Sequence, residues 1–430
     1  MKDTRTKLQC GLRGVNPMAE DSAVAGVLEP LESDLTHLLR HGSPNGAPWL
    51  VCSGGTTSRC AAPAAWTLDL RPGFRTLEIS EDHTIVRLGT GLSMAEVLQE
   101  LANMGRSIPA GLSRLPGAGY LLTGGLSPLS RGLGLAIDRI VAIDGVWGCG
   151  EPFHLERESC RSTPDQQRRW RGLLGAAPFL AVVTAITINT VPVENLEIWY
   201  GRSNLKELAR LIRQAEKWPE DTTLQWFWRD AVEILVVRRG IVSDWGCQAW
   251  RDLECLSGVV LERRQIGDFK HLPQLGLINL ERCPAARRHS EVVGLLGPAG
   301  VDWSRWLQNL QPLMRHRPDP VCAIAAQQIG GVCCRQPLEE SSFIHRSSEW
   351  KPWITAAWKA GDENARQRSL SWLENVWGCL SSACPGVHLA QLHPHLAWHQ
   401  QELSAAFGPW LAGLRNLKAD VDPHGALPPL

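Results

Sequence analysis

The sequence predicts an α+β fold, because two regions with different hydrophobic patterns follow each other along the chain. From about residue 23 to residue 193, short apolar runs are separated by glycine, which is typical of strands joined by tight turns. From about residue 195, helix-like segments alternate with hairpin-like ones, which is typical of an antiparallel sheet covered by helices. The length of 430 residues, 44% of them hydrophobic, suffices for two or three domains.

Five segments of the first region are expected to contain strands. They are WTLDL (66–70), TLEIS (76–80), TIVRLGTG (84–91), RIVAIDG (139–145) and FLAVVTAITINTV (179–191). One helix among them is well marked, because Ser93 and Glu96 form a capping box and Gly105 provides a stop signal.

The pattern of the second region predicts two helices, a hairpin and a further strand. We expect helices over 203–218, ended by Pro219, and over 362–378, ended by Gly378. The hairpin pairs a strand near 224–228 with one near 233–237, and the further strand covers 323–337. Trp226 and Trp228 share one face of their strand, which favours a place in the core; an aromatic wall for a planar or sugar-like substrate is the alternative.

The amino-acid composition limits the kinds of molecule that the protein is expected to bind. The 44 basic and 44 acidic residues leave no net charge to attract nucleic acid or an anionic membrane, so we expect a small-molecule substrate. No apolar run follows the basic first residues, and the longest one, FLAVVTAI, is too short to span a bilayer. None of the 13 cysteines stands in a CxxC pair, so we expect reduced, buried thiols and a cytoplasmic protein.

A metal site is not expected. His393, His395 and His399 have a spacing that zinc ligands can use, and Cys384 lies upstream. However, Pro394 would break a helix there and no acidic ligand is expected nearby, so surface or core histidines are the preferred interpretation.

Two glycine-rich segments carry the strongest functional signal. The first, which we name the first loop, follows an apolar run and consists of Ser53, Gly54, Gly55, Thr56, Thr57 and Ser58. Successive backbone N–H groups in such a turn can bind a phosphate or diphosphate, although a polar surface turn has the same composition.

The second loop, residues 117–131, belongs to the stretch PGAGYLLTGGLSPLSRGLGLAIDRIV (116–141). Its glycines allow the backbone to approach a ligand closely. It lacks the nicotinamide dinucleotide fingerprint, because Leu122 stands where the third glycine belongs. Together the loops indicate one long ligand held from both sides.

The order and spacing of these motifs resemble the FAD-binding (PCMH-type) domain of the vanillyl-alcohol oxidase and cresol methylhydroxylase superfamily. Later segments resemble its berberine-bridge-enzyme-like branch, namely WRGLLGAAPFLAVVT (170–184), QQIGGVCCRQPLEESSFIHR (327–346) and FGPWLAGLRNLKADVDPHGAL (407–427). The resemblance implies an FAD-binding domain over 1–193, a substrate domain with an antiparallel sheet over 194–403, and a segment, 404–430, that returns to the FAD domain.

The resemblance also assigns the FAD contacts. The first loop, Ser53 to Ser58, would wrap the diphosphate, and Gly119 to Ser130 of the second loop would follow the diphosphate and ribityl chain toward the ring. The remaining contacts implied are Gly119, Tyr120, Thr123, Gly124, Gly125, Ser127, Ser130, Arg131, Gly134, Leu135, Val182 and Val183. Arg131 has an alternative, an ion pair with Asp138.

Departures from the family pattern predict non-covalent FAD. Thr56 stands where many relatives attach flavin through histidine, and Leu112, Ser113 and Arg114 stand where some use cysteine. Tyr120 replaces the histidine of the second loop, and the tyrosine and asparagine expected near the closing segment have no equivalent.

The resemblance implies an FAD-dependent oxidoreductase that moves hydride from an alcohol, sugar or related C–H substrate to flavin N5, with dioxygen or another acceptor reoxidising the flavin. The candidate catalytic residues are Glu233, Gln328 and Tyr120, with Gln327 as a further substrate contact. His345 and Arg346 are expected to be structural. The alternative is a degenerate relative that keeps the fold for a binding or assembly role.

Overall fold

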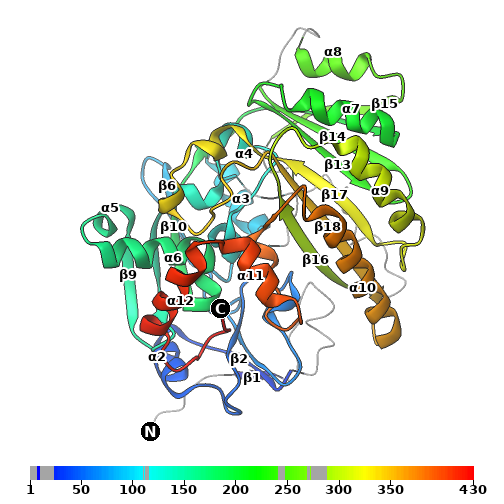
Figure 1. Ribbon diagram of the computed structural model, residues 1–430. Helices are drawn as coiled ribbons and strands as arrows, with labels where there is room; N and C mark the ends of the chain where they lie inside the picture. Colours follow the sequence, from blue (N-terminus) through cyan, green and yellow to red (C-terminus); the bar gives the residue numbers. More distant parts are fainter. Residues whose placement is uncertain are drawn as a thin grey trace.

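The computed structural model describes residues 7–9, 24–109, 111, 116–240, 247–268, 272 and 288–430. Helices and antiparallel sheets occur together, which confirms the predicted α+β class. Figure 1 shows a first part built around two small sheets and a second part built around one large sheet, with the red C-terminal helices lying against the first part.

The first part contains a four-stranded and a five-stranded sheet. The four-stranded order is β1-β2-β4-β3, in which β2, β4 and β3 are parallel, and the antiparallel five-stranded order is β5-β6-β10-β8-β9. The bounds are β1 Lys7–Gln9, β2 Gly26–Glu29, β3 Leu50–Cys52, β4 Trp66–Asp69, β5 Leu77–Ile79, β6 Ile85–Gly89, β8 Ile140–Trp147, β9 Pro152–Glu156 and β10 Ala181–Asn189. A small pair joins β7 Arg106–Ser107 to β11 Val191–Pro192.

The helices of the first part include the one that the sequence marked most clearly. Helix α3 (Met94–Asn103) has the predicted capping box: Ser93 Oγ accepts from the Glu96 N–H at 3.4 Å, and Glu96 Oε2 accepts from the Ser93 N–H at 2.9 Å. The others are α2 Glu32–His41, α4 Ser130–Leu133, α5 Arg157–Cys160, α6 Pro164–Leu180, and the 3-10 helices η1 Ser58–Cys60, η2 Ala118–Thr123 and η3 Ala136–Arg139.

The second part is an eight-stranded antiparallel sheet of order β15-β12-β14-β13-β17-β18-β16-β19. Its strands are β12 Leu196–Ser203, β13 Thr222–Trp228, β14 Val232–Arg239, β15 Val259–Gly267, β16 Arg288–Leu296, β17 Ala323–Gln328, β18 Trp350–Lys359 and β19 Gly386–Val387. Its helices are α7 Leu205–Ala215, α8 Gln248–Glu254, α9 Trp303–Arg315 and α10 Glu363–Leu380. The predicted hairpin is confirmed, because β13 and β14 pair with Trp226 opposite Ile234.

The two faces of this sheet have different neighbours. On one face Trp226 packs edge-on against Trp303 of α9, with ring centroids 5.8 Å apart, so Trp226 belongs to the core beneath the helices. On the other face, Thr223 Oγ1 donates to the backbone oxygen of Pro128 at 2.6 Å. This second face therefore looks toward the second loop, as Figure 1 also shows, with α7, α9 and α10 on the far side of the strands.

Three predicted element boundaries were wrong. The strand expected over 323–337 ends at Gln328, where positive φ angles at Gly330 and Gly331 turn the chain into the 3-10 helix η6 (Gly331–Arg335). Gly378 does not stop α10, which continues to Leu380. Phe179 and Leu180 belong to the end of α6, so β10 begins only at Ala181.

The C-terminal helices α11 (His399–Phe407) and α12 (Trp410–Val421) pack on α6, where a Cβ on Gly172 would lie 2.3 Å from Leu417 Cδ2. Short 3-10 helices η7 (Leu338–Glu340) and η8 (Leu389–Gln391) complete the fold. Within the described ranges, no helix is both long and apolar enough to cross a bilayer. The cysteines described are all free, and most are buried, but Cys255 and Cys334 are exposed, contrary to expectation.

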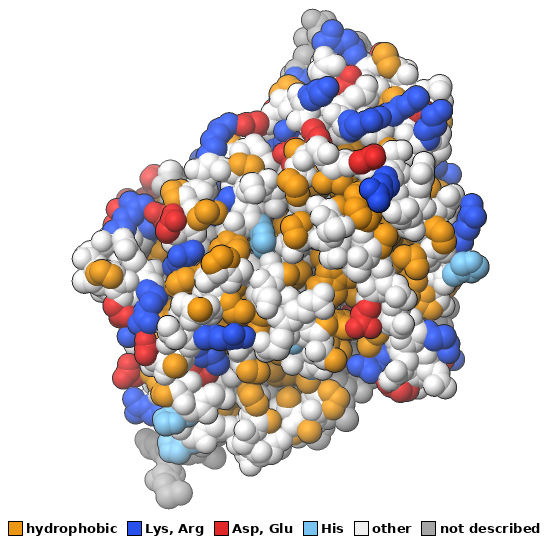
Figure 2. Space-filling view, viewed as in Figure 1, with side chains coloured by type: hydrophobic (Ala, Val, Ile, Leu, Met, Phe, Trp, Pro, Cys, Tyr) orange, Lys and Arg blue, Asp and Glu red, His pale blue; other side chains and the backbone are white. Residues whose placement is uncertain are grey.

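The surface seen in Figure 2 is chemically uneven. Lys, Arg, Asp and Glu side chains of both signs crowd its edges, whereas the central area over α11 is mostly hydrophobic or uncharged. The face shown therefore has no extended region of one charge.

Candidate functional site

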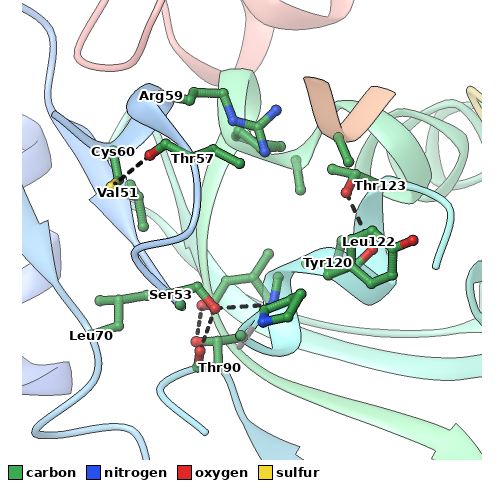
Figure 3. Close-up of a pocket in the computed structure, with 18 of the residues that line it drawn as sticks. Val51, Ser53, Thr57, Arg59, Cys60, Leu70, Thr90, Tyr120, Leu122 and Thr123 are labelled. Carbon is green, nitrogen blue, oxygen red and sulfur yellow. Dashed lines mark hydrogen bonds between the residues drawn. The ribbon is translucent and has the colours of Figure 1, made fainter. Parts of the chain in front are cut away.

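A cleft lies where the two glycine-rich loops meet. It contains about 900 Å³ of space between protein atoms, part of it open to solvent. Residues from seven separate segments line it: Val51, Ser53, Gly54, Gly55, Thr56, Thr57, Arg59, Cys60, Leu70, Thr90, Pro116, Gly117, Gly119, Tyr120, Leu122, Thr123, Ala177, Pro178, Ala181, Val183, Ala390 and Pro428. Figure 3 shows Thr57 and Arg59 on one side and Tyr120, Leu122 and Thr123 on the other.

The two loops touch backbone to backbone. A Cβ on Gly54 would lie 2.1 Å from the nitrogen of Gly117, so only glycine fits this contact. Ser53 Oγ accepts from the Gly119 N–H at 3.0 Å and donates to the backbone oxygen of Thr90. Thr90 Oγ1 in turn donates to the Val183 oxygen at 2.7 Å, so the two loops and β10 form one rigid wall (Figure 3).

The first loop is suited to an anion. In the part of the chain that the structure describes, the N–H groups of Gly54, Gly55 and Thr56 donate to no protein acceptor. Among the described residues of the lining, Arg59 is the only charged one, and its Nη1 donates to the Leu389 oxygen at 3.2 Å. Burial lowers the pKa of Arg59 to about 10, so the side chain stays cationic at neutral pH. Successive free N–H groups next to a cation form a binding site for phosphate oxygens.

About half of the residues expected to contact the ligand line the cleft. Those present are Ser53, Gly54, Gly55, Thr56, Thr57, Gly119, Tyr120, Thr123 and Val183. Those outside the lining are Ser58, Gly124, Gly125, Ser127, Ser130, Arg131, Gly134, Leu135 and Val182. The candidates Leu112, Ser113 and Arg114 lie outside the described residues.

The buried polar groups of the second loop serve the fold. Ser130 Oγ accepts from the Ser127 N–H at 2.9 Å. Arg131 donates to the backbone oxygens of Trp218 and Thr222 and lies 3.5 Å from Glu349 Oε1. The alternative ion pair between Arg131 and Asp138 is therefore wrong.

The partner of Asp138 is Arg346, whose two terminal nitrogens donate to its two carboxylate oxygens at 2.7 and 2.9 Å. Both side chains are buried, so the pair ties the turn after the second loop to the corner that follows η7. Arg346 thus has the structural role that the sequence predicted. His345 is structural in the same sense, because its Nε2 bonds the Ala405 oxygen at 2.6 Å.

None of the three catalytic candidates is placed as a base at the cleft. Glu233 pairs with Arg229 at 3.3 Å and does not line it. Gln328 points to the helix-covered face, where its amide bonds the backbone of Leu224 and Ala215 and the Glu349 carboxylate. Tyr120 lines the cleft, but its hydroxyl donates to the Leu126 oxygen and burial raises its pKa, so it stays a neutral phenol.

The clustered histidines form a buried network with acidic residues, which the sequence analysis did not expect. His393 lies 2.6 Å from Glu402 Oε1 and 3.3 Å from Glu291 Oε2. His395 also contacts Glu291, which accepts from Ser58 Oγ at 2.7 Å. The network joins the first loop, the large sheet and α11; Glu291 is more than a hundred residues from His393, and only the fold brings it there.

Several lining residues were missed. Arg59 directly follows the first loop and could have been included on that ground. Ala390 and Pro428 arrive from distant segments, so no local motif marks them.

Comparison with known proteins agrees with this geometry. No family model matches the chain. The uncharacterised FAD-linked oxidoreductase YgaK of Bacillus subtilis (strain 168) is 20% identical over 377 residues, which cover 83% of this chain and 80% of that protein.

Two solved structures superpose over nearly the whole chain. A chitooligosaccharide oxidase gives a TM-score of 0.82 at 14% identity, covering 98% of this chain and 96% of its own. Berberine bridge enzyme from Eschscholzia californica gives 0.78 at 18% identity, covering 96% and 92%. The chain therefore has the fold of the berberine-bridge-enzyme-like FAD-linked oxidoreductases, which confirms the resemblance indicated by its sequence motifs.

Proposed function

We propose that the protein is an FAD-dependent oxidoreductase that oxidises an alcohol, sugar or related C–H substrate. The observation that carries the proposal is the cleft between the two glycine loops, where free backbone N–H groups and Arg59 form an anion site at one side of a long binding space. The Bacillus subtilis relative is an FAD-linked oxidoreductase by name and one neighbour is a chitooligosaccharide oxidase, and both support the same chemistry.

The residues present fit FAD. The first loop would hold the diphosphate, and Tyr120, Leu122 and Thr123 would contact the ribityl chain and ring. When bound, FAD supplies a two-electron acceptor for hydride from carbon. The tight contact of Ser53, Gly54 and Gly117 fixes the two loops against each other, which supports a preformed site for the diphosphate.

We further propose that the FAD is not covalently attached. Threonine at position 56 lacks the nucleophilic ring nitrogen through which a histidine attaches flavin, and Thr56 lines the cleft. The division at 193/194 and 403/404 and a cytoplasmic location, argued from cysteine usage, remain predictions of the same kind.

A visible absorption spectrum, repeated on the supernatant after acid precipitation, tests the cofactor. We expect a flavin spectrum that moves entirely into the supernatant. Flavin retained in the pellet would contradict non-covalent binding. A colourless protein that also fails to bind added FAD would overturn the proposed function in favour of a degenerate relative.

The placement of the cofactor needs a variant that fills the cleft without disturbing the loops. Gly125 is unsuitable, because a Cβ there would lie 2.4 Å from Ala136 Cβ and strain the loop itself. Thr57→Trp is better, because Thr57 lines the cleft and its hydroxyl caps no helix. We expect it to lower the flavin content at least tenfold, whereas Gln99→Trp on the exposed face of α3 should keep it. Equal flavin content in both variants would refute the placement.

A further inference from the structure

A group of buried polar side chains, with several polar atoms that make no hydrogen bond, lies next to the cleft on the sheet face that looks toward the second loop. Gln225, Gln327 and Lys351 stand side by side on β13, β17 and β18, in a register that pairs Gln225 with Gln327 and Gln327 with Lys351. Directly opposed residues in antiparallel strands have side chains on the same face, about 5 Å apart at Cβ. All three are at least nine-tenths buried.

His388 connects this row to the cleft. A Cβ on Gly124, the residue after the cleft-lining Thr123, would lie 3.0 Å from His388 Nε2. On its other side, a Cβ on Gly294 would lie 3.1 Å from His388 Cβ, and Gly294 pairs with Trp353. The amine of Lys351 lies 5.0 Å from the centre of the Trp353 ring. His388 thus lies between Gly124, which follows a lining residue, and Gly294 of β16, whose neighbour across the sheet, Trp353, lies beside Lys351.

Several polar atoms of these side chains have no hydrogen-bond partner within the described ranges. Both ring nitrogens of His388, Oε1 of Gln225 and Nε2 of Gln327 are buried and make no hydrogen bond. Within the described ranges, the Lys351 amine has no hydrogen bond and no carboxylate partner, since the nearby Glu349 bonds Gln328 and Arg131 instead. Leaving such groups without partners costs roughly 1–3 kcal/mol each, so the arrangement indicates a polar ligand that completes them.

The charge state of the group fits a base. Burial alone lowers the pKa of Lys351 to about 7, and no carboxylate opposes that effect. Burial, Lys351 and Arg59 together hold the pKa of His388 well below its usual value, so its ring is neutral. Near pH 7 the Lys351 amine is therefore partly deprotonated, next to a neutral imidazole that can donate one hydrogen bond and accept another.

We propose that Lys351 is the catalytic base that accepts the substrate's hydroxyl proton, and that His388 and Gln327 hold the same substrate oxygen. The proposal rests on the proposed function. The O–H bond breaks and its proton joins the lone pair of Lys351 Nζ, giving an ammonium. The O–H electron pair forms the carbonyl bond, and the C–H pair leaves as hydride to the flavin of the proposed function. This assignment replaces Glu233, Gln328 and Tyr120, which the structure commits elsewhere.

Three variants test it in the FAD-loaded protein: Lys351→Met, Lys351→Arg, and Lys359→Met as a matched control at the exposed end of the same strand. The first readout is anaerobic flavin reduction by a panel of alcohols and sugars. We expect both Lys351 variants to be at least ~100-fold slower at equal flavin content, and the control to be unchanged. In the wild type the rate should rise with pH around a midpoint near 7, as the amine loses its proton. Arginine that retains wild-type rates would overturn the proposal, because it would show that only a positive charge is needed.

The second readout needs no substrate. Brief acetylation by acetic anhydride over a pH series, quantified by mass spectrometry, reports the amine's protonation and its access from the cleft. We expect Lys351 to label with a midpoint near pH 7, and Lys359 only at its ordinary, higher pH. Labelling of Lys351 in the ordinary range, or none at any pH, would overturn the proposal even if the flavin is bound. Absence of flavin would instead refute the proposed function.

Discussion

Replacing Lys351 by methionine should stabilise the protein, and the gain should depend on pH. Methionine has a similar length and flexible shape, and it can occupy the apolar space beside Trp353 without a charge. The pKa of the buried amine falls from 10.5 to about 7. At ~1.4 kcal/mol for each factor of ten, this gap of about 3.5 corresponds to ~5 kcal/mol of destabilisation that the lysine imposes below pH 7.

The direction follows from proton binding. Between pH 7 and 10.5 the unfolded lysine is protonated and the folded one is not, so unfolding takes up a proton and wild-type stability rises with pH in this window. The advantage of Lys351→Met should therefore be ~5 kcal/mol at pH 6, fall by ~1.4 kcal/mol per pH unit above 7, and vanish near 10.5. Urea unfolding with excess FAD, at pH values from 6 to 10, measures it. A variant that is less stable at pH 6, or whose advantage does not change with pH, would refute the burial of an uncompensated amine, and Lys359→Met should show no such trend.

Three further variants test the structural assignments. Asp138→Asn should cost ~3–5 kcal/mol in urea unfolding, because Arg346 is left buried without its partner; a loss below ~1 kcal/mol would contradict the pairing. His393→Asn should destabilise at pH 6 and progressively less as the pH rises through about 10. Burial disfavours the imidazolium, but Glu402 raises its pKa to about 10, so its stabilisation is complete below 6.5 and lost above 10. Gln328→Leu should lower stability by ~1–3 kcal/mol while flavin reduction is kept; lost reduction at unchanged stability would restore Gln328 as a catalytic residue.

The features that the sequence predicted correctly are those with short-range causes. The capping box of Ser93 and Glu96 and the hairpin of β13 and β14 depend on neighbours in the chain, and both are present. The sequence also indicated that the two glycine loops lie on either side of one ligand, because glycine allows close approach of the backbone. The structure brings Gly54 and Gly117 into direct contact.

The place of Gln328 away from the cleft has a geometric reason. Gln327 and Gln328 are adjacent, so they point to opposite faces of the sheet, and the sequence alone does not say which face looks toward the cleft. Gln328 lies on the helix-covered face, where the hydrogen bonds of its amide stabilise the fold. Lys351 lies in the run WKPW, which has the pattern of an ordinary strand. Its burial depends on the neighbouring strand β17 and on His388, which belongs to a different part of the chain.

Hydrogen-bond satisfaction separates two kinds of buried polar residue in this chain. Arg346, His393 and Gln328 each make several hydrogen bonds within the fold, although Nε of Arg346 makes none, so most of their cost of burial is offset there. His388 and Gln327 have none, and Lys351 has no counter-charge in the described ranges. Burying each such group without a partner costs roughly 1–3 kcal/mol. Three of them together therefore indicate a ligand that binds there. Their position behind Gly124, beside a cleft suited to FAD, makes a substrate hydroxyl the partner that the arrangement lacks.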